Sequence, residues 1–474
     1  MKDNLKERTI SGMLWTAVQR FGRMGIMFVG NLVLARLLSP EDFGYIGMLM
    51  VFIAIANTFV DSGFGAALIQ RKEPTQTDYS TIFYWNLIVA FFFCGVFYIS
   101  APWIAAFYRL PDLVPILRVQ SLVLILNAFS IIQLNQLTKQ LEFKILAKVN
   151  LVAALGGVVL GILTAYMGWG VWSLVMMNLS NAFLLNVVVW YATKWKPMWC
   201  FSWQSFKSLF GYGSLILVSS LIETIYTNIQ LLIVGRVFSA KTLGYFTQAK
   251  KMEEVPVMGL SDVVNQVTFS VYSRVQDDRQ RLVNGLRKSI QGITFLSFPL
   301  MVLLIVIAPG LFKLLFTDKW LDAVPLFQML CVSKLIFTIN TTNVSAIKAI
   351  GRSDMSLYAN LLKKVVAFLL MGIGIYGWGM KGFLVALVVD SFTHFLINSY
   401  FVGRLLHYGV WRQIKDVLPH YLLAILLGIL VYYLSSFLHV HYVALLLLQC
   451  IIYSLLYLLL AYLFKMNAFL LCRE

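Results

Sequence analysis

The chain has 474 residues, of which 60% are apolar and only 12% are charged, whereas about a quarter of an ordinary soluble domain is charged. This composition excludes a soluble globular protein and indicates an integral membrane protein, whose solvent is the lipid bilayer. The net charge of +17 requires no nucleic-acid partner, because basic cytoplasmic loops account for it. The five cysteines form no CxxC motif or Cys/His cluster, so we expect neither disulfides nor a metal site.

Fourteen apolar stretches are each long enough to cross about 30 Å of hydrocarbon as helices. They lie at residues 10–37, 43–69, 80–107, 113–138, 146–167, 170–193, 209–235, 242–270, 286–316, 323–347, 354–377, 381–406, 417–438 and 441–464. The first stretch has no small-residue cleavage site after it, so we expect a retained helix and not a signal peptide. The sequence therefore predicts an all-α integral membrane protein of about fourteen transmembrane helices.

The distribution of lysine and arginine predicts the orientation of the chain. With a cytoplasmic N-terminus, about 25 basic residues fall on the inner side and about five on the outer side. The inner residues include Arg71, Lys72 and those of the loop 274–288, and the outer ones include Arg109 and Lys319. Such a bias in short loops predicts that both termini are cytoplasmic.

A weak internal repeat relates the two halves of the chain. Its short matches are Arg36-Leu-Leu-Ser39 with Arg236-Val-Phe-Ser239, Gly44-Tyr45 with Gly244-Tyr245, Ala101-Pro102 with Ala308-Pro309, and Val114-Pro115-Ile116 with Val324-Pro325-Leu326. Six spans separate the copies, so the halves share one topology and an axis along the membrane normal. We expect an N-terminal six-helix lobe (1–200), a C-terminal six-helix lobe (201–410) and a two-helix extension (411–474).

Motifs within the first 150 residues resemble the polysaccharide-transport family. They are Gly12 and Trp15, Leu34-Ala-Arg-Leu-Leu-Ser-Pro-Glu-Asp-Phe-Gly44, Asp61-Ser-Gly-Phe-Gly65, Ala67-Leu-Ile-Gln-Arg71 and Gln140-Leu-Glu-Phe-Lys144. The last two are similar to motifs of Wzx-type exporters of colanic-acid-like and teichuronic-acid-like polymers. That family belongs to the superfamily that also contains multidrug MATE exporters and the peptidoglycan-precursor flippase. The second half of the chain matches the family more loosely.

The resemblance implies a flippase that moves an undecaprenyl-diphosphate-linked oligosaccharide from the inner to the outer leaflet of the bacterial cytoplasmic (inner) membrane. The oligosaccharide would be a repeat unit of an exopolysaccharide, a colanic-acid-like polymer or an O-antigen. The implied fold is a V-shaped bundle of two six-helix lobes that works by alternating access, without ATP, a cofactor or enzymatic activity. The implied partners are this substrate and membrane lipids, with polymerase or assembly proteins and a coupling H⁺ or Na⁺ ion as further candidates.

The first span carries charged residues at membrane depth, where an ionisable group costs roughly 2.5–3.5 kcal/mol and is a functional candidate. Arg20, Arg23 and Asn31 follow a spacing of three and four residues through Met27, which places them on one helical face. Arginine offers bidentate donors to phosphate, so we expect these three residues to bind the substrate headgroup. Alternatively, Arg20 lies near enough to the inner surface to snorkel to water.

Two acidic residues are candidates for gating or coupling. Glu223, in the middle of the seventh span, corresponds to Arg23 at the offset of the repeat. The two would pair when the lobes close, or Glu223 would carry a coupling proton; a buried structural ion pair is the alternative. Asp61 lies near the cytoplasmic end of the second span, where it would gate, cap the helix or pair with Arg20.

Later spans add four more candidates. Lys250 and Lys251 of the eighth span would reach the headgroup, although pairing with Glu254 one turn away is the alternative. Asp390 and His394 are spaced as i and i+4 on one helix and would form a protonatable pair for coupling or gating. No residue is assigned to catalysis.

Three other functions compete with flipping. A MATE-type multidrug exporter would have twelve spans and a cavity for organic cations. The cationic first helix argues against such a cavity. A membrane glycosyltransferase would need a sizeable outer loop around its acidic residues, and the loop at Glu41-Asp42 is short. A scaffold for a polysaccharide assembly complex that transports nothing is the third alternative.

Overall fold

The computed structural model describes residues 2–274, 278–438 and 440–466, and these residues are helical apart from short connections. The prediction of an all-α protein is confirmed. The chain divides into two compact units, 1–247 and 248–474. The predicted boundaries of the lobes and of the C-terminal extension stay predictions.

The first unit is built from nine helices and the start of a tenth. They are α1 (Lys2–Leu37), α2 (Pro40–Asp61), α3 (Phe64–Gln70), α4 (Gln76–Tyr108), α5 (Leu113–Gln120), α6 (Leu122–Lys139), α7 (Phe143–Tyr166), α8 (Val171–Thr193), α9 (Trp203–Val237) and α10 (Ala240–Arg274). The second unit holds the rest of α10 and the later helices. They are α11 (Arg279–Phe316), the 3-10 helix η1 (Asp318–Ala323), α12 (Val324–Lys334), α13 (Phe337–Ala349), α14 (Ser353–Leu406), α15 (Val410–Ser436) and α16 (Tyr442–Leu463).

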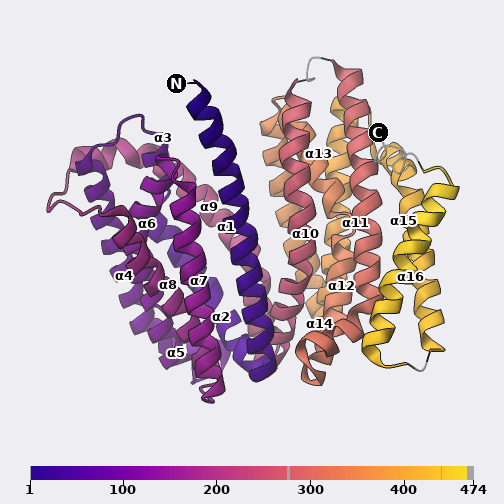
Figure 1. Ribbon diagram of the computed structural model, residues 1–474, viewed down its shortest axis with the longest axis horizontal. Helices are drawn as coiled ribbons and strands as arrows, with labels where there is room; N and C mark the ends of the chain where they lie inside the picture. Colours follow the sequence, from indigo (N-terminus) through magenta and orange to yellow (C-terminus); the bar gives the residue numbers. More distant parts are fainter. Residues whose placement is uncertain (1, 275–277, 439, 467–474) are drawn as a thin grey trace. The chain divides into compact units, whose positions relative to one another are not determined.

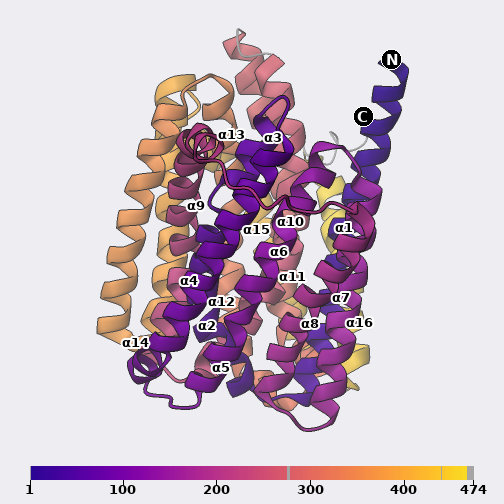
Figure 2. The ribbon, with the colours of Figure 1, turned by 90° about the vertical axis from the view of Figure 1, so that its left-hand side faces the viewer.

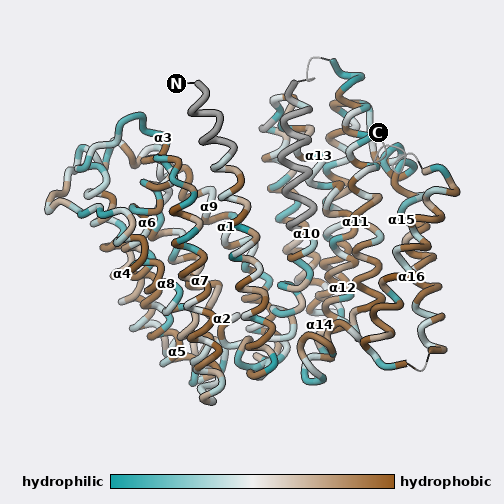
Figure 3. Tube along the Cα trace, viewed as in Figure 1, coloured by the Kyte–Doolittle hydropathy of each residue, from teal (hydrophilic) through white to brown (hydrophobic). Residues whose placement is uncertain are grey.

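Eleven helical segments in the described part of the chain are long and apolar enough to cross a membrane. Figure 3 shows hydrophobic residues in brown along α11, α15 and α16. α14 counts once among the eleven, although Trp378 and Gly379 break its helical backbone, and α1 and α10 are not among them. The predicted fourteen would follow if α14 crosses twice and both α1 and α10 also cross, so that number stays a prediction.

The internal repeat reproduces the same local structure in both copies. α2 begins at Pro40 and α10 at Ala240, after serines that act as N-caps. The Ser39 hydroxyl accepts from the Asp42 N–H at 3.3 Å, and the Ser239 hydroxyl accepts from the Thr242 N–H at 3.1 Å. A serine at the N-cap satisfies an N–H group that has no partner inside the helix. The repeat is therefore visible in the backbone as well as in the sequence.

The starts of α2 and α10 are in backbone contact at two glycines. A Cβ atom at Gly44 would overlap the carbonyl oxygen of Ala240, and a Cβ atom at Gly244 would overlap that of Pro40. Residues 240 and 244 are the repeat counterparts of 40 and 44, so the two contacts are equivalent by a local pseudo-twofold relation. Because glycine has no side chain, the two helices approach more closely than any other residue would allow.

Three glycines of α1 let this helix pack closely against α7 (Figure 2). A Cβ atom at Gly12 would lie 2.7 Å from the Phe143 ring and one at Gly22 would lie 2.9 Å from Leu151, while Gly30 faces Val158 in the same way. The contacts advance together along both helices, so α1 and α7 run in the same direction. Small residues at such an interface replace side-chain volume with backbone proximity, which is how helices associate in lipid.

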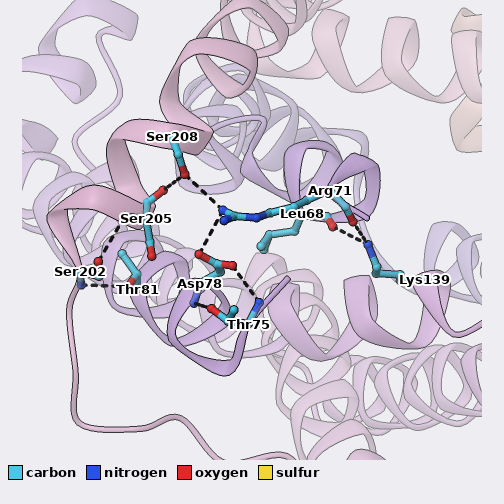
Figure 4. Close-up of polar contacts among 9 residues, drawn as sticks. All are labelled: Leu68, Arg71, Thr75, Asp78, Thr81, Lys139, Ser202, Ser205 and Ser208. Carbon is cyan, nitrogen blue, oxygen red and sulfur yellow. Dashed lines mark hydrogen bonds and ion pairs between the residues drawn. The ribbon is translucent and has the colours of Figure 1, made fainter. Parts of the chain in front are cut away.

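A polar network ties α9 to α3 and α4 at the end of the unit where α1 begins (Figure 1). Figure 4 shows Arg71, after α3, whose Nη1 lies 3.2 Å from Asp78 Oδ1 and 3.2 Å from the Ser208 hydroxyl of α9. Asp78 also completes the N-cap of α4 by accepting from the Thr75 N–H at 2.8 Å. The ammonium of Lys139 donates to the last carbonyl groups of α3, including that of Leu68 at 3.1 Å. Arg71 and Lys139 therefore have structural roles.

Replacing Asp78 by alanine is expected to lower the free energy of unfolding by about 2–3 kcal/mol. The change removes an N-cap acceptor, which is worth about 1 kcal/mol, and one partner of a largely buried ion pair. Arg71 is 37% exposed, so solvent screens part of the loss. The measurement is unfolding of the purified protein in mixed micelles, with Asp318→Ala as the control. Asp318 is 72% exposed and paired with Lys313, so an equal loss in both variants would contradict the prediction.

The second unit is organised around α11, which packs against α12, α13, α15 and α16. Figure 1 shows α15 and α16 in yellow beside α11. The Tyr457 hydroxyl of α16 donates to the carbonyl of Phe295 on α11 at 3.1 Å, and Gly428 of α15 faces Val302 of α11. The last two helices are therefore part of the same compact unit as α11.

α14 folds back on itself at its break. Gly379 has a φ of +58°, a conformation that glycine adopts without strain. The backbones of Gly374 and Gly382 then meet so closely that a Cβ atom on either would overlap the carbonyl group of the other. The two halves of α14 therefore form a tight helical hairpin, and this brings polar residues far apart in the sequence together.

Candidate functional site

The basic residues of α1 lie on an exposed part of that helix. Arg20 and Arg23 are both exposed, and Asn31 is half-buried. Arg23 Nη1 donates to the Oδ1 of Asn150 on α7 at 3.5 Å. The amide oxygen thus contacts one edge of the exposed Arg23 guanidinium, whose planar set of N–H donors suits an anionic ligand.

α7 adds two lysines beside the segment of α1 that leads to these arginines. Since Gly12 faces Phe143 and Gly22 faces Leu151, residues 143–151 of α7 lie beside residues 12–22 of α1. Lys144 and Lys148 fall in this segment and are exposed. Lys144 Nζ lies 5.7 Å from the centre of the Trp15 ring, a cation–π contact. The basic surface of the first unit is therefore formed by α1 and α7 together.

The two acidic candidates of the first unit lie near the contact of α2 with α9. Thr58 of α2 and Thr224 of α9 share a hydrogen bond of 3.0 Å between their hydroxyl groups. Glu223, next to Thr224, is exposed, as is Asp61 one turn beyond Thr58. The roles of Glu223 and Asp61 in gating, and the pairing of Glu223 with Arg23, stay predictions.

Lys250 and Lys251 lie on α10 in the second unit, where Lys251 is exposed and Lys250 is half-buried. Their neighbour Glu253 is buried, and its carboxylate lies 3.9 Å from the ammonium of Lys334 at the end of α12. α12 and α13 are separated by a break just after Lys334. Lys334 thus lies at the interruption between α12 and α13, inside an apolar segment. Interrupted helices of this kind are frequent at the binding sites of membrane transporters.

Asp390 and His394 form the pair that their spacing predicts. The Nε2 of His394 lies 3.3 Å from the Oδ1 of Asp390. Asp390 is about 16 Å along the helix from the break at Gly379, so the pair lies in the middle of the second half of α14. Its role in coupling or gating stays a prediction.

Lys363, which sequence reasoning missed, joins this pair from the first half of α14. The Lys363 ammonium is buried and donates to the Oδ1 of Asn398 at 3.2 Å. Asn398 donates to the Oδ1 of Asn340 on α13 at 3.2 Å. The charge of Lys363 acts on both Asp390 and His394. We call Lys363, Asp390, His394, Lys334 and Glu253 the charge cluster; Lys363 and Glu253 are buried and the other three are half-buried.

A lysine inside an apolar segment was the only signal that could have identified Lys363, because its partners lie about 30 residues further along the chain. Among the residues that the structure describes, no group of three or more His, Cys, Asp and Glu side chains could hold a metal ion. Lys363, Asp390 and His394 are the ionisable side chains that the fold of α14 brings together.

A family of known proteins matches most of this chain. The family model described as "Polysaccharide biosynthesis protein" matches residues 33–325, which is more than half of the sequence. The chain belongs to the polysaccharide biosynthesis protein family. The resemblance inferred from the N-terminal motifs is therefore confirmed, and the match extends well beyond them.

Relatives in the polysaccharide biosynthesis family align with the chain over most of its length. The teichuronic acid biosynthesis protein TuaB of Bacillus subtilis is 25% identical over 91% of this chain and 90% of its own. The lipopolysaccharide biosynthesis protein WzxC of Escherichia coli is 28% identical over 84% of this chain and 81% of its own. The succinoglycan biosynthesis transport protein ExoT of Rhizobium meliloti is 26% identical over 74% of this chain and 71% of its own.

Solved structures show which fold this family member has. The lipid II flippase MurJ in an inward closed conformation superimposes with a TM-score of 0.78 and 14% identity, covering 96% of this chain and 99% of that one. An inward-facing multidrug MATE transporter superimposes with a TM-score of 0.61 and 16% identity, covering 84% of this chain and 98% of that one. The predicted fold relationship to MATE transporters and to the peptidoglycan-precursor flippase is confirmed.

Proposed function

We propose that this protein is a flippase that moves a diphosphate-lipid-linked oligosaccharide from the inner to the outer leaflet of the bacterial cytoplasmic membrane by alternating access. The observation that carries the proposal is the pair of exposed arginines, Arg20 and Arg23, on the first helix of a polysaccharide biosynthesis protein. Names of relatives support it, since they refer to the biosynthesis of teichuronic acid, lipopolysaccharide and succinoglycan and, for one, to transport.

The headgroup chemistry supports arginine as the ligand. A diphosphate carries oxygens that accept two parallel N–H bonds from one guanidinium, and such charge-assisted bonds are stronger where water is scarce. If α1 leaves the hydrocarbon layer near Leu37, Arg23 lies about 21 Å further along the helix and therefore inside that layer of about 30 Å. Asn150 contacts the guanidinium from α7, and the lipid tail would stay in the bilayer while the headgroup passes along the basic surface.

Two other basic residues of the first unit support a cytoplasmic N-terminus. Arg71 and Lys139 lie in the network at the end of the first unit where α1 begins (Figures 1 and 4), and basic residues favour the cytoplasmic side. Transport, and not catalysis, is favoured because the longest connection between described helices is the short segment 194–202. Such a segment leaves no room for a catalytic domain.

Drug export of the MATE type is the second candidate, because a MATE transporter has a related fold. A cavity for organic cations would place carboxylates at the substrate, whereas α1 presents guanidinium groups. Like charges repel, so the electrostatics favour an anionic substrate. Organic cations should therefore fail to compete with lipid-linked oligosaccharide for transport.

Replacing Arg23 by alanine is expected to reduce flipping at least tenfold while protein abundance stays near normal. Arg23→Lys should recover only part of the activity, because an ammonium cannot form the bidentate contact. The measurement is transfer of a fluorescent lipid-linked oligosaccharide between leaflets of proteoliposomes that contain the full-length protein. Arg281→Ala is the matched control, since Arg281 is 79% exposed. Full activity of Arg23→Ala would remove Arg23 from the site, and a large drop in abundance would assign it a structural role.

A further inference from the structure

The charge cluster lies within helices of the second unit that are otherwise largely apolar. Lys363 and Asp390 are each near the middle of one half of α14, and the hairpin at Gly374 and Gly382 brings these halves together. Charged groups in such places are costly and mark ion or proton pathways in membrane proteins. The arginines of α1 belong to the other unit of the chain.

The pair at its centre needs a proton. The Asp390 Oδ1 and the His394 Nε2 are 3.3 Å apart, and neither has a hydrogen-bond partner among the described residues. A carboxylate oxygen and a bare imidazole nitrogen both present lone pairs, so they are stable at this distance only with a proton between them. The proton can reside on either atom, because imidazole titrates near neutral pH and a buried carboxylate readily becomes neutral.

The charges of the cluster balance one another. Two ammonium groups, of Lys363 and Lys334, face two carboxylates, of Asp390 and Glu253, so the cluster is neutral while His394 is neutral. Lys363 acts on both Asp390 and His394, and Lys334 acts on His394 and on Glu253. The outer groups that act on members of the cluster are Lys348 and Lys364 towards Lys363, and Lys250 and Glu254 towards Glu253.

We propose that Asp390 and His394 bind the proton whose movement drives the transport cycle, and that Lys363 is a built-in cation that excludes Na⁺ from the same place. The driving role rests on the proposed flippase function, whereas proton binding by the pair does not. The Lys363 ammonium already bonds to the Asn398 oxygen, a type of oxygen that would ligate a sodium ion. A second positive charge within a few ångströms is repelled strongly in a low dielectric.

Protonation would bias a conformational equilibrium through charge. With a proton on His394 the cluster carries one net positive charge, which is disfavoured in an apolar interior. The conformation in which the pair reaches water is then favoured, and release of the proton there restores the neutral cluster. A two-state protein shifts by as much as the proton distinguishes its states, so uptake from one side and release on the other would move one proton across the membrane in each cycle.

The first experiment measures proton binding in substrate-free, full-length protein in lipid nanodiscs. Infrared difference spectra between acidic and alkaline buffer should contain a carboxylic-acid carbonyl band that disappears in Asp390→Asn and shifts in His394→Gln. Asp318→Asn, at an exposed ion pair, should leave the band unchanged. A wild-type spectrum that lacks any band sensitive to Asp390→Asn would overturn the proton site.

The second experiment measures flipping in proteoliposomes under an imposed pH gradient or an imposed Na⁺ gradient. The pH gradient should stimulate the wild type at least tenfold, the Na⁺ gradient should not, and Asp390→Asn and His394→Gln should lose the stimulation. Stimulation by Na⁺ alone, or full stimulation of Asp390→Asn, would overturn the proposal. Absence of flipping by the wild type under every gradient would reject the flippase function instead, and the infrared measurement would still decide the proton site.

A double variant distinguishes loss of the proton site from misfolding. Asp390→Asn leaves the Lys363 ammonium buried without its carboxylate, so it should lower the melting temperature. Asp390→Asn combined with Lys363→Met removes both charges and should melt close to the wild type while remaining insensitive to the pH gradient. If this folded double variant still responds to the gradient as the wild type does, the proposal is wrong.

Discussion

Alanine in place of Gly44 or of Gly244 is expected to reduce transport about 5- to 150-fold, which corresponds to about 1–3 kcal/mol. The added methyl group would overlap a backbone carbonyl oxygen, of Ala240 or of Pro40 respectively. A flexible side chain could move aside, but a carbonyl group at the start of a helix moves only with its helix. The starts of α2 and α10 would therefore have to separate.

The two single changes should have similar effects because their contacts are equivalent by the repeat. Combining them should cost little more than either alone, since separation of the helices by the first methyl group makes room for the second. Such a shortfall from additivity is what coupled neighbours show. Flipping in proteoliposomes and the melting temperature of each variant provide the two readouts.

Gly95→Ala is the matched control for this experiment. Gly95 lies within α4, and an added Cβ atom would have no heavy atom from another part of the structure within 4 Å. Its flipping rate should therefore match the wild type. Wild-type flipping by Gly44→Ala and Gly244→Ala would mean that transport does not require the close contact of α2 with α10.

The sequence predicted much of this local architecture because its signals are short-range. The serine N-caps and glycines of α2 and α10 were detectable as a repeat, since each copy specifies its own helix start with residues a few positions apart. The length and apolarity of the spans likewise follow from continuous stretches. By contrast, the pairing of Arg71 with Asp78 and Ser208 joins three elements, and neither periodicity nor composition indicates it.

The same distinction separates the predicted parts of the candidate site from the missed ones. Asp390 and His394 were paired from sequence because a helix places residues i and i+4 side by side. Lys363 meets them only because α14 breaks at Gly379 and folds back. The contact of Glu253 with Lys334 likewise joins two helices, α10 and α12, that are far apart in the sequence. Contacts of this kind depend on tertiary structure, and no local pattern in a single sequence indicates them.

Replacing Gln413 by leucine is expected to lower the free energy of unfolding by about 2–4 kcal/mol. Gln413 is fully buried at the start of α15. Its Oε1 accepts from Asn343 Nδ2 and from the Ser399 hydroxyl, both at 2.9 Å, and its Nε2 donates to the carbonyl of Tyr408 at 3.0 Å. Leucine would leave three buried polar groups without this partner, at about 1–3 kcal/mol each.

The polar groups around Gln413 should recover part of the lost free energy by bonding to one another. The expected loss is therefore smaller than the sum of the three separate contributions. Asn343 Nδ2 also lies 3.3 Å from the Ser399 hydroxyl, so these two groups can strengthen their own bond. The ion pair of Arg287 with Asp416, at 2.5 Å, would still hold α15 against α11. The expected result is a destabilised but folded protein.

The control is Gln280→Leu, which makes the same chemical change on an exposed surface of α11 and should alter the free energy of unfolding by less than about 0.5 kcal/mol. Unfolding in mixed micelles, followed by accessibility of a cysteine introduced for Ala424, would show whether α15 separates before the rest of the unit. Ala424 is fully buried, so early labelling in Gln413→Leu alone would mean that the network of Gln413 attaches the last two helices. Equal stability of Gln413→Leu and the wild type would contradict this, and apolar packing against α11 would then suffice to hold them.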